Sequence, residues 1–160
     1  MSKTLIFLQE NKLTNMDELN SKAESAAKHF HELQGTIRAA DRRMTEISEL
    51  RTQIIHYAKT REVYVTYRKT GYSKKFRAEH EAEILLHQAA KEFFDKLGLK
   101  KLPKVKELNA EYTELLRQKK ATYPDYRKAK EEMQRLLRAQ KNIERFFAEE
   151  TPQPARQQSR

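Results

Sequence analysis

The sequence predicts an all-α protein, arranged as a long antiparallel coiled-coil helical hairpin with additional shorter helices. Two long stretches carry apolar residues at alternating spacings of three and four, which is the repeat of a coiled-coil seam. The composition agrees, because 35% charged and only 38% hydrophobic residues favour narrow apolar seams over a thick globular core. Only three glycines occur among 160 residues, so the chain offers few turn signals.

The first element expected is a short N-terminal helix within residues 1–13, built around the apolar run at residues 5–8. Asn11-Lys12 then predicts a break. Asn15 and Glu18 have the spacing of a capping box, so a second helix should begin near Met16.

The second helix, about residues 16–69, carries the first seam. Its apolar positions continue for about four heptads. They are Leu19, Ala23, Ala26, Phe30, Leu33, Ile37, Ala40, Met44 and Ile47. Gly71 is expected to end this helix as a left-handed cap. The β-branched run at residues 63–66 lies within the helical pattern and therefore does not predict a strand.

A third helix is expected at about residues 74–97, with Ser73 as its N-cap. Gly98 should end it, with Leu99 supplying the hydrophobic contact of the cap. The fourth helix, about 103–148, begins at Pro103, where a missing N–H is harmless.

The fourth helix carries the second seam. The seam keeps its register across Pro124, so we expect a kink there and not the end of the helix. Its positions are Val105, Leu108, Tyr112, Leu115, Lys119, Thr122, Tyr126, Ala129, Met133, Leu136, Gln140, Ile143 and Phe147. The Pro- and Gln-rich residues 151–160 should form a disordered tail.

Two seams of similar length favour antiparallel pairing within one chain, so residues 14–150 should form one coiled-coil helical module. At 1.5 Å per residue the two helices would be roughly 80 Å and roughly 65 Å long. A homodimer formed through one seam is the competing arrangement.

The charge balance points to an anionic partner. The chain has 33 Lys and Arg against 23 Asp and Glu, a net charge of +10, which suits nucleic acid, an acidic protein or an anionic surface. Cysteine is absent, which excludes disulfides and thiolate metal sites. No apolar stretch approaches the ~20 residues of a membrane span. We therefore expect a cytoplasmic protein without a membrane partner.

One segment combines cations with tyrosines and forms the candidate nucleic-acid-binding surface. Cations hold phosphates, and tyrosine rings stack on unpaired bases. The candidate residues are Lys59, Arg61, Tyr64, Tyr67, Arg68, Lys69, Tyr72, Lys74, Lys75 and Arg77. A solvated basic face with tyrosines as core filler is the competing interpretation. A second basic cluster contains Lys96, Lys100, Lys101, Lys104 and Lys106.

Two histidine patterns suggest metal chemistry and are rejected on spacing. His29-Phe30-His31 has the form of the metal site in HUH endonucleases, but on a helix residues i and i+2 point about 200° apart. His80 and His87, with Glu83 on the same expected face, are separated by about 10 Å along a helix, too far for one zinc. No phosphate loop or catalytic set occurs, so we expect no enzyme activity, cofactor or metal.

Three stretches resemble the C-terminal region of relaxase/mobilization proteins from conjugative and mobilizable elements of Firmicutes. They are residues 2–11 (SKTLIFLQEN), residues 59–112, from KTREVYVTYRKTGYSKKF to KVKELNAEY, and residues 126–137 (YRKAKEEMQRLL). Relaxases nick DNA with an N-terminal HUH-type domain, and nothing in this chain matches that domain. The start of the chain resembles an internal point of the longer proteins, as expected for a truncated or split reading frame.

The resemblance implies a non-catalytic helical module that supports DNA transfer. Its partners would be DNA, proteins of the conjugation machinery or the rest of the relaxase. Two alternatives remain open. One is a coiled-coil scaffold for protein interaction, and the other is a small inhibitor, encoded by a mobile element, of a host nucleic-acid enzyme.

Overall fold

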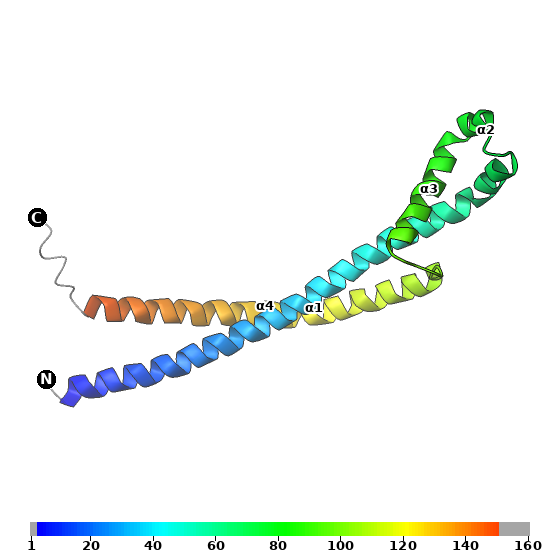
Figure 1. The fold of residues 1–160 in the computed structure, drawn as a ribbon. Helices are drawn as coiled ribbons and strands as arrows, with labels where there is room; N and C mark the ends of the chain where they lie inside the picture. The colour runs from blue at the N-terminus through cyan, green and yellow to red at the C-terminus, as the bar shows by residue number, and fades with distance from the viewer. Residues whose placement is uncertain (1–2, 151–160) are drawn as a thin grey trace, which may run out of the picture. The chain divides into compact units, whose positions relative to one another are not determined.

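The computed structural model describes the backbone of residues 3–150 and the side chains of residues 16–149. This part of the chain is all-α, as predicted, with four helices and no strand. The helices are α1 (Lys3–Lys69), α2 (Lys74–Glu79), α3 (Glu81–Lys96) and α4 (Val105–Glu150) (Figure 1). The expected tail at 151–160 and the expected burial at 5–8 lie outside the described residues.

The predicted separate N-terminal helix is wrong, because α1 is continuous from Lys3 to Lys69. Asn11, Lys12 and Asn15 all lie inside it, so the expected break and capping box do not occur. Asparagine costs less than ~0.7 kcal/mol in a helix interior, which is too little to end a helix by itself. No proline or glycine precedes Gly35, so nothing in this region forces a break.

The two predicted seams agree with the observed burial. Every predicted seam position from Leu19 to Ile47 on α1 is buried or half-buried, and so is every one from Val105 to Phe147 on α4. The register continues through Pro124, since Thr122 and Tyr126 on either side of it are both half-buried. Pro124 itself is exposed and α4 continues through it, so it does not end the helix.

The predicted third helix is divided in two at His80. Its backbone leaves the helical region with φ −126° and ψ 29°, ending α2 and starting α3. Ser73 caps α2 as predicted, because its hydroxyl accepts a hydrogen bond from the Phe76 N–H at 3.3 Å. α2 buries no side chain, whereas α3 buries Ile84, His87, Ala90 and Phe94. The break therefore separates a solvated turn of helix from one that packs into a core.

Both predicted glycine caps form. Gly71 and Gly98 have φ of 69° and 67°, the left-handed region that glycine adopts without a Cβ clash. After Gly98, the Leu99 N–H bonds to the Phe94 carbonyl at 3.2 Å and the Gly98 N–H to the Asp95 carbonyl at 3.0 Å. This is the Schellman pattern, and the Leu99 side chain packs on the core cluster that contains Phe94.

The chain divides into two compact units. The first contains residues up to Arg38 and from Lys119 onward, and the second is Ala39–Gln118. In the first, Phe30 stacks on Tyr126 with ring centroids 5.2 Å apart, and Gln140 donates a hydrogen bond to Asn20 at 2.8 Å. The Phe30–Tyr126 contact joins the two predicted seams, and the Asn20–Gln140 hydrogen bond joins α1 to α4 at an exposed position.

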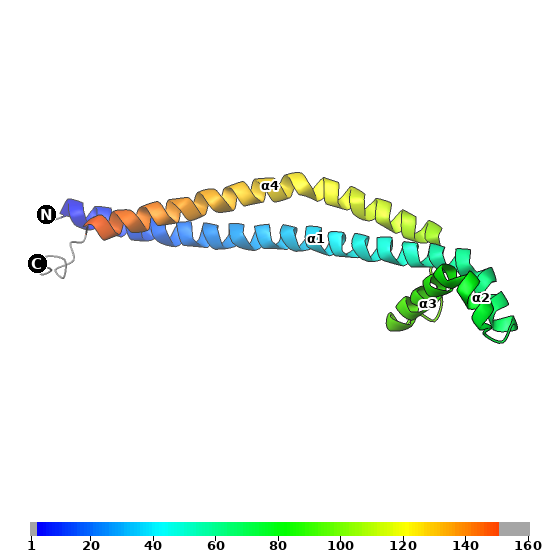
Figure 2. The ribbon, with the colours of Figure 1, turned by 90° about the horizontal axis from the view of Figure 1, so that it is seen from above.

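The second unit contains the main hydrophobic cluster, which is formed by three helices. Its buried members are Ile47 and Leu50 of α1, Ala90 and Phe94 of α3, and Leu108 of α4. Beside the cluster, Arg43 donates two hydrogen bonds to Glu111, at 2.7 and 3.0 Å. α3 folds back beside the C-terminal part of α1, which Figures 1 and 2 show from two directions. This packing positions the candidate site.

Candidate nucleic-acid interface

All seven cations of the candidate surface are exposed. Lys59, Arg61, Arg68 and Lys69 lie on the last turns of α1, and Lys74, Lys75 and Arg77 lie on α2. None of them makes an ion pair with any residue that the structure describes, so their charge is not neutralised locally. One acidic residue, Glu62, lies within the same segment. The surface therefore presents a net positive charge to solvent.

The three tyrosines of the candidate surface have different roles. Tyr67 is buried, only 5% exposed, and stacks on Phe76 with centroids 6.2 Å apart. Tyr64 is half-buried and stacks on His87 at 4.3 Å. Their rings pack inside the protein, as the competing interpretation proposed for the tyrosines. Tyr72 differs, because 56% of it is exposed.

The backbone holds Tyr72 in an unusual conformation. The Tyr72 N–H bonds to the Tyr67 carbonyl and the Gly71 N–H to the Arg68 carbonyl, both at 3.0 Å, a second Schellman motif. Tyr72 has φ of 60°, a left-handed value that costs a residue with a Cβ about 1–2 kcal/mol. Its ring meets the Tyr67 ring almost perpendicularly, at 87° and 5.2 Å. Tyr67 therefore orients Tyr72 without covering it.

A shallow open pocket of about 440 Å³ lies beside this motif. It is lined by Val65, Arg68, Lys69 and Tyr72. Val65, Arg68 and Lys69 share one face of the last turns of α1 because they are three or four residues apart, and Tyr72 joins them from the left-handed turn after the helix. An exposed aromatic ring and two cations thus share one concave surface, which sequence spacing alone did not single out.

The second basic cluster lies away from the first. α3 runs back along α1 from His80, so that Tyr64 and Tyr57 both stack on His87, and Tyr57 also contacts Phe94. Lys96 ends α3, about 24 Å from its start at 1.5 Å per residue. Lys96 also lies 3.5 Å from Glu92, which partly neutralises it. The structure therefore does not merge the two clusters into one surface.

His87 forms a buried polar contact that the sequence did not reveal. Its ring is sandwiched between Tyr57 and Tyr64, with centroids 4.5 and 4.3 Å away and interplanar angles of 21° and 17°. Its Nδ1 lies 3.0 Å from the Thr60 hydroxyl, which donates its own hydrogen to the His56 carbonyl at 2.7 Å. The Thr60 oxygen is thus available to accept from Nδ1–H. The expected shared face with His80 and Glu83 does not form, because His80 breaks the helix and Glu83 is exposed.

Lowering the pH should destabilise the packing of α3 through His87. Burial lowers the pKa of His87, and the charge of nearby Lys91 lowers it further. Above the unfolded-state value of about 6.5 the imidazole is neutral in both states, so its contribution is fully present. As the pH falls through that value towards the lowered folded-state pKa, the unfolded state binds more protons and stability is lost.

Urea unfolding between pH 7.5 and 5 would test this dependence. His87→Gln should flatten the pH profile of the unfolding free energy, whereas His29→Gln, at an exposed position, should leave it unchanged. Equal pH profiles for the wild type and His87→Gln would contradict the role assigned to His87.

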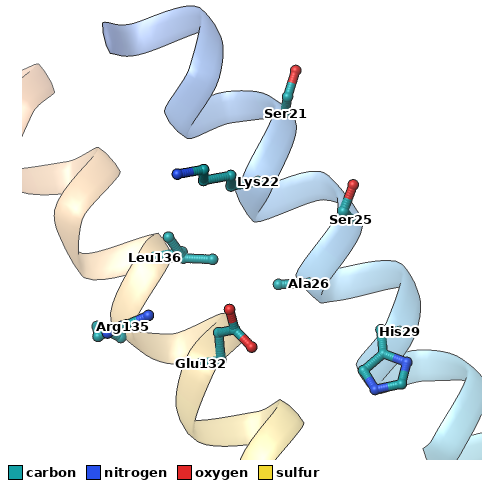
Figure 3. Close-up of a pocket in the computed structure, with 8 residues that line it drawn as sticks. All are labelled: Ser21, Lys22, Ser25, Ala26, His29, Glu132, Arg135 and Leu136. Carbon is teal, nitrogen blue, oxygen red and sulfur yellow. The ribbon is translucent and has the colours of Figure 1, made fainter.

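The His29-Phe30-His31 motif lies in the helix α1, as the apolar seam that contains Phe30 predicted. Phe30 is buried, while both histidines are exposed. Figure 3 shows His29 at the edge of an open groove of about 570 Å³, where Lys22 and Ala26 of α1 face Glu132 and Leu136 of α4. Across residues 16–149, no three His, Asp or Glu side chains are grouped closely enough to hold a metal ion.

The fold and this surface define an all-α protein that exposes a cluster of cations around one exposed tyrosine. Comparison with protein-family models, curated proteins and solved structures finds no match to the chain. Within the described helices, no segment has both the length and the apolar character needed to cross a membrane.

Proposed function

We propose that the chain binds nucleic acid through the basic surface at the end of α1 and on α2, without catalysing a reaction. The observation that carries this proposal is the set of seven exposed cations within residues 59–77 that form no ion pair with described residues. A cation on a helix can pair with an acid three or four residues away, as Arg117 does with Glu114. Unpaired cations grouped at one place instead attract phosphates, whose counterions they release.

The same proposal assigns the chain to DNA transfer, as a helical module of a relaxase/mobilization protein. The sequence resemblance over residues 59–112 supports this assignment, and those residues include the whole basic surface. In this role the module would hold DNA near the origin of transfer or dock to the transfer machinery. Finding a nicking domain in frame with or adjacent to this chain in the upstream coding sequence would support the assignment, and finding an unrelated gene there would count against it.

The charge reversal Lys74→Glu, Lys75→Glu and Arg77→Glu should weaken DNA binding and flatten its salt dependence. Each phosphate that the variant no longer neutralises lowers the slope of log K against log salt by about 0.7–0.9. Fluorescence anisotropy with a labelled oligonucleotide, measured at several salt concentrations, would give both quantities. All three residues are exposed and α2 buries no side chain, so the fold should tolerate the change.

A matched control is the reversal of Lys128, Lys130 and Lys141 to Glu on α4. These residues are also exposed, and the change in net charge is identical. A general effect of charge would weaken binding equally in both variants, whereas a local surface requires a larger loss in the α2 variant. Unchanged affinity of the α2 variant would overturn the assignment of the surface.

We further infer that α1 and α4 form an antiparallel coiled-coil hairpin. Two observations support this inference. The buried positions of both helices follow the heptad spacing. In each unit, a residue further along α1 contacts a residue that comes earlier in α4. The first unit has the contacts Asn20–Gln140 and Phe30–Tyr126. The second has Arg43–Glu111 and Arg51–Asn109.

A second candidate function is a scaffold for protein interaction, favoured by an apolar stripe on α3. Leu85 and Leu86 are 47% and 42% exposed, and Ala82 and Ala89, one turn away on either side, are also exposed. Light scattering of the protein with and without DNA separates the two candidates. A stable dimer whose mass does not change when DNA is added supports the scaffold. A monomer whose mass increases when DNA is added supports the nucleic-acid binder.

A further inference from the structure

We infer that the pocket beside Tyr72 binds an unpaired nucleotide, so that the surface prefers single-stranded over double-stranded nucleic acid. This inference rests on the proposed function and specifies its ligand. Of the three tyrosines in the candidate surface, only Tyr72 is an exposed residue, with 56% of its surface accessible. A flat exposed ring stacks on a base only when that base is not already stacked within a duplex.

The backbone at Tyr72 supports a role beyond packing. A left-handed φ of 60° is strained for tyrosine, and asparagine or glycine would adopt it at lower cost. Strained conformations cluster at functional sites, where the strained residue is held for its side chain. Here two hydrogen bonds of the Schellman motif and the contact with the buried Tyr67 ring hold Tyr72 at the surface. The ring is thus oriented before a ligand arrives.

The side chains next to Tyr72 supply the positive charge that the phosphate of a nucleotide requires. Arg68 and Lys69 line the same open pocket as Tyr72. Both cations are exposed and neither pairs with a described acid. A base stacked on Tyr72 would therefore bring its 5′ or 3′ phosphate within reach of two cations. Lys74, Lys75 and Arg77 follow on α2 and can hold the adjoining phosphates.

Removing the ring of Tyr72 should weaken binding to single strands selectively. When truncation abolishes base–aromatic stacking, affinity falls by about 5- to 150-fold. We expect that loss for a labelled oligothymidylate with Tyr72→Ala and Tyr72→Asn, and less than about a 3-fold loss for a duplex of equal length. Tyr72→Phe keeps the ring and should bind as the wild type does.

Two comparisons make the result specific. Tyr72→Asn suits the left-handed backbone, so it separates the effect of the ring from that of the cap. Tyr123→Ala removes another exposed tyrosine, 44% exposed on α4, and should leave binding unchanged. Circular dichroism would verify that each variant keeps its helices.

The outcomes distinguish this inference from the proposed function on which it rests. If Tyr72→Asn binds single strands as tightly as the wild type, or loses single-strand and duplex binding equally, the nucleotide pocket is wrong. The nucleic-acid surface would still stand in that case if reversal of the α2 cations weakened binding. If reversal of the α2 cations leaves the affinity for nucleic acid unchanged, the proposed function is wrong, irrespective of the results for the Tyr72 variants.

Discussion

Replacing Phe94 with alanine should lower the free energy of unfolding of the Ala39–Gln118 unit by about 3–5 kcal/mol. Phe94 is only 6% exposed and lies in the cluster where α1, α3 and α4 meet. Its ring also contacts Tyr57 at 5.6 Å in an edge arrangement, and Tyr57 in turn stacks on His87. The substitution removes buried apolar area and leaves a cavity that rigid helices fill only in part.

The destabilisation should be local to α3 before it becomes global. Hydrogen exchange of the α3 amides, together with urea unfolding, would show whether α3 detaches from α1 first. Leu86→Ala on the same helix is the control, because Leu86 is 42% exposed and its truncation opens no cavity. Leu86→Ala should lower the free energy of unfolding by less than about 1 kcal/mol. Equal costs for the two variants would contradict the packing of α3 described above.

The second large effect is expected from Ile47→Ala, which should lower the free energy of unfolding by about 2–5 kcal/mol. Ile47 is fully buried, 0% exposed, and is the last position of the predicted heptad seam on α1. It packs in the same cluster as Phe94 and Leu108. Domain stabilities are only about 5–15 kcal/mol, so this loss would be a large part of the total.

A graded series tests the burial of Ile47 quantitatively. Ile47→Val should cost about 0.5–1.5 kcal/mol, since it removes a single methyl group. Ile55→Ala changes the same residue type on the same helix, but Ile55 is 38% exposed, and the cost should be clearly smaller than at Ile47. An Ile47→Ala variant no less stable than Ile55→Ala would show that Ile47 is not in a packed core. The measurement is urea unfolding followed by circular dichroism.

Local signals in the sequence were enough to predict most of the helical architecture. The seams on α1 and α4 were predicted residue by residue, because burial along a helix follows the spacing of apolar side chains. Gly71, Gly98 and Ser73 were also predicted in their observed roles. These features depend on residues close in sequence, and their physical requirements, such as a left-handed cap, are visible in the residue type.

The helix boundaries that were missed depend on weaker or more distant forces. The expected break at Asn11-Lys12 is absent from α1, because asparagine disfavours a helix only weakly and lysine is a good helix former. The break at His80 was not expected, because no glycine or proline marks it. It accompanies the packing of His87, Ala90 and Phe94, whose partners on α1 are distant in sequence.

The candidate site shows the same division between local pattern and tertiary contact. The order of residues was sufficient to predict an all-α protein with two heptad seams, a net charge of +10 and a cluster of cations interleaved with tyrosines at residues 59–77. It could not predict which tyrosine is available to a ligand, since the packing of α2 and α3 against the end of α1 buries Tyr67 and covers part of Tyr64. Tyr72 alone of the three stays mainly exposed, because it follows the last turn of α1 and a left-handed backbone holds it there.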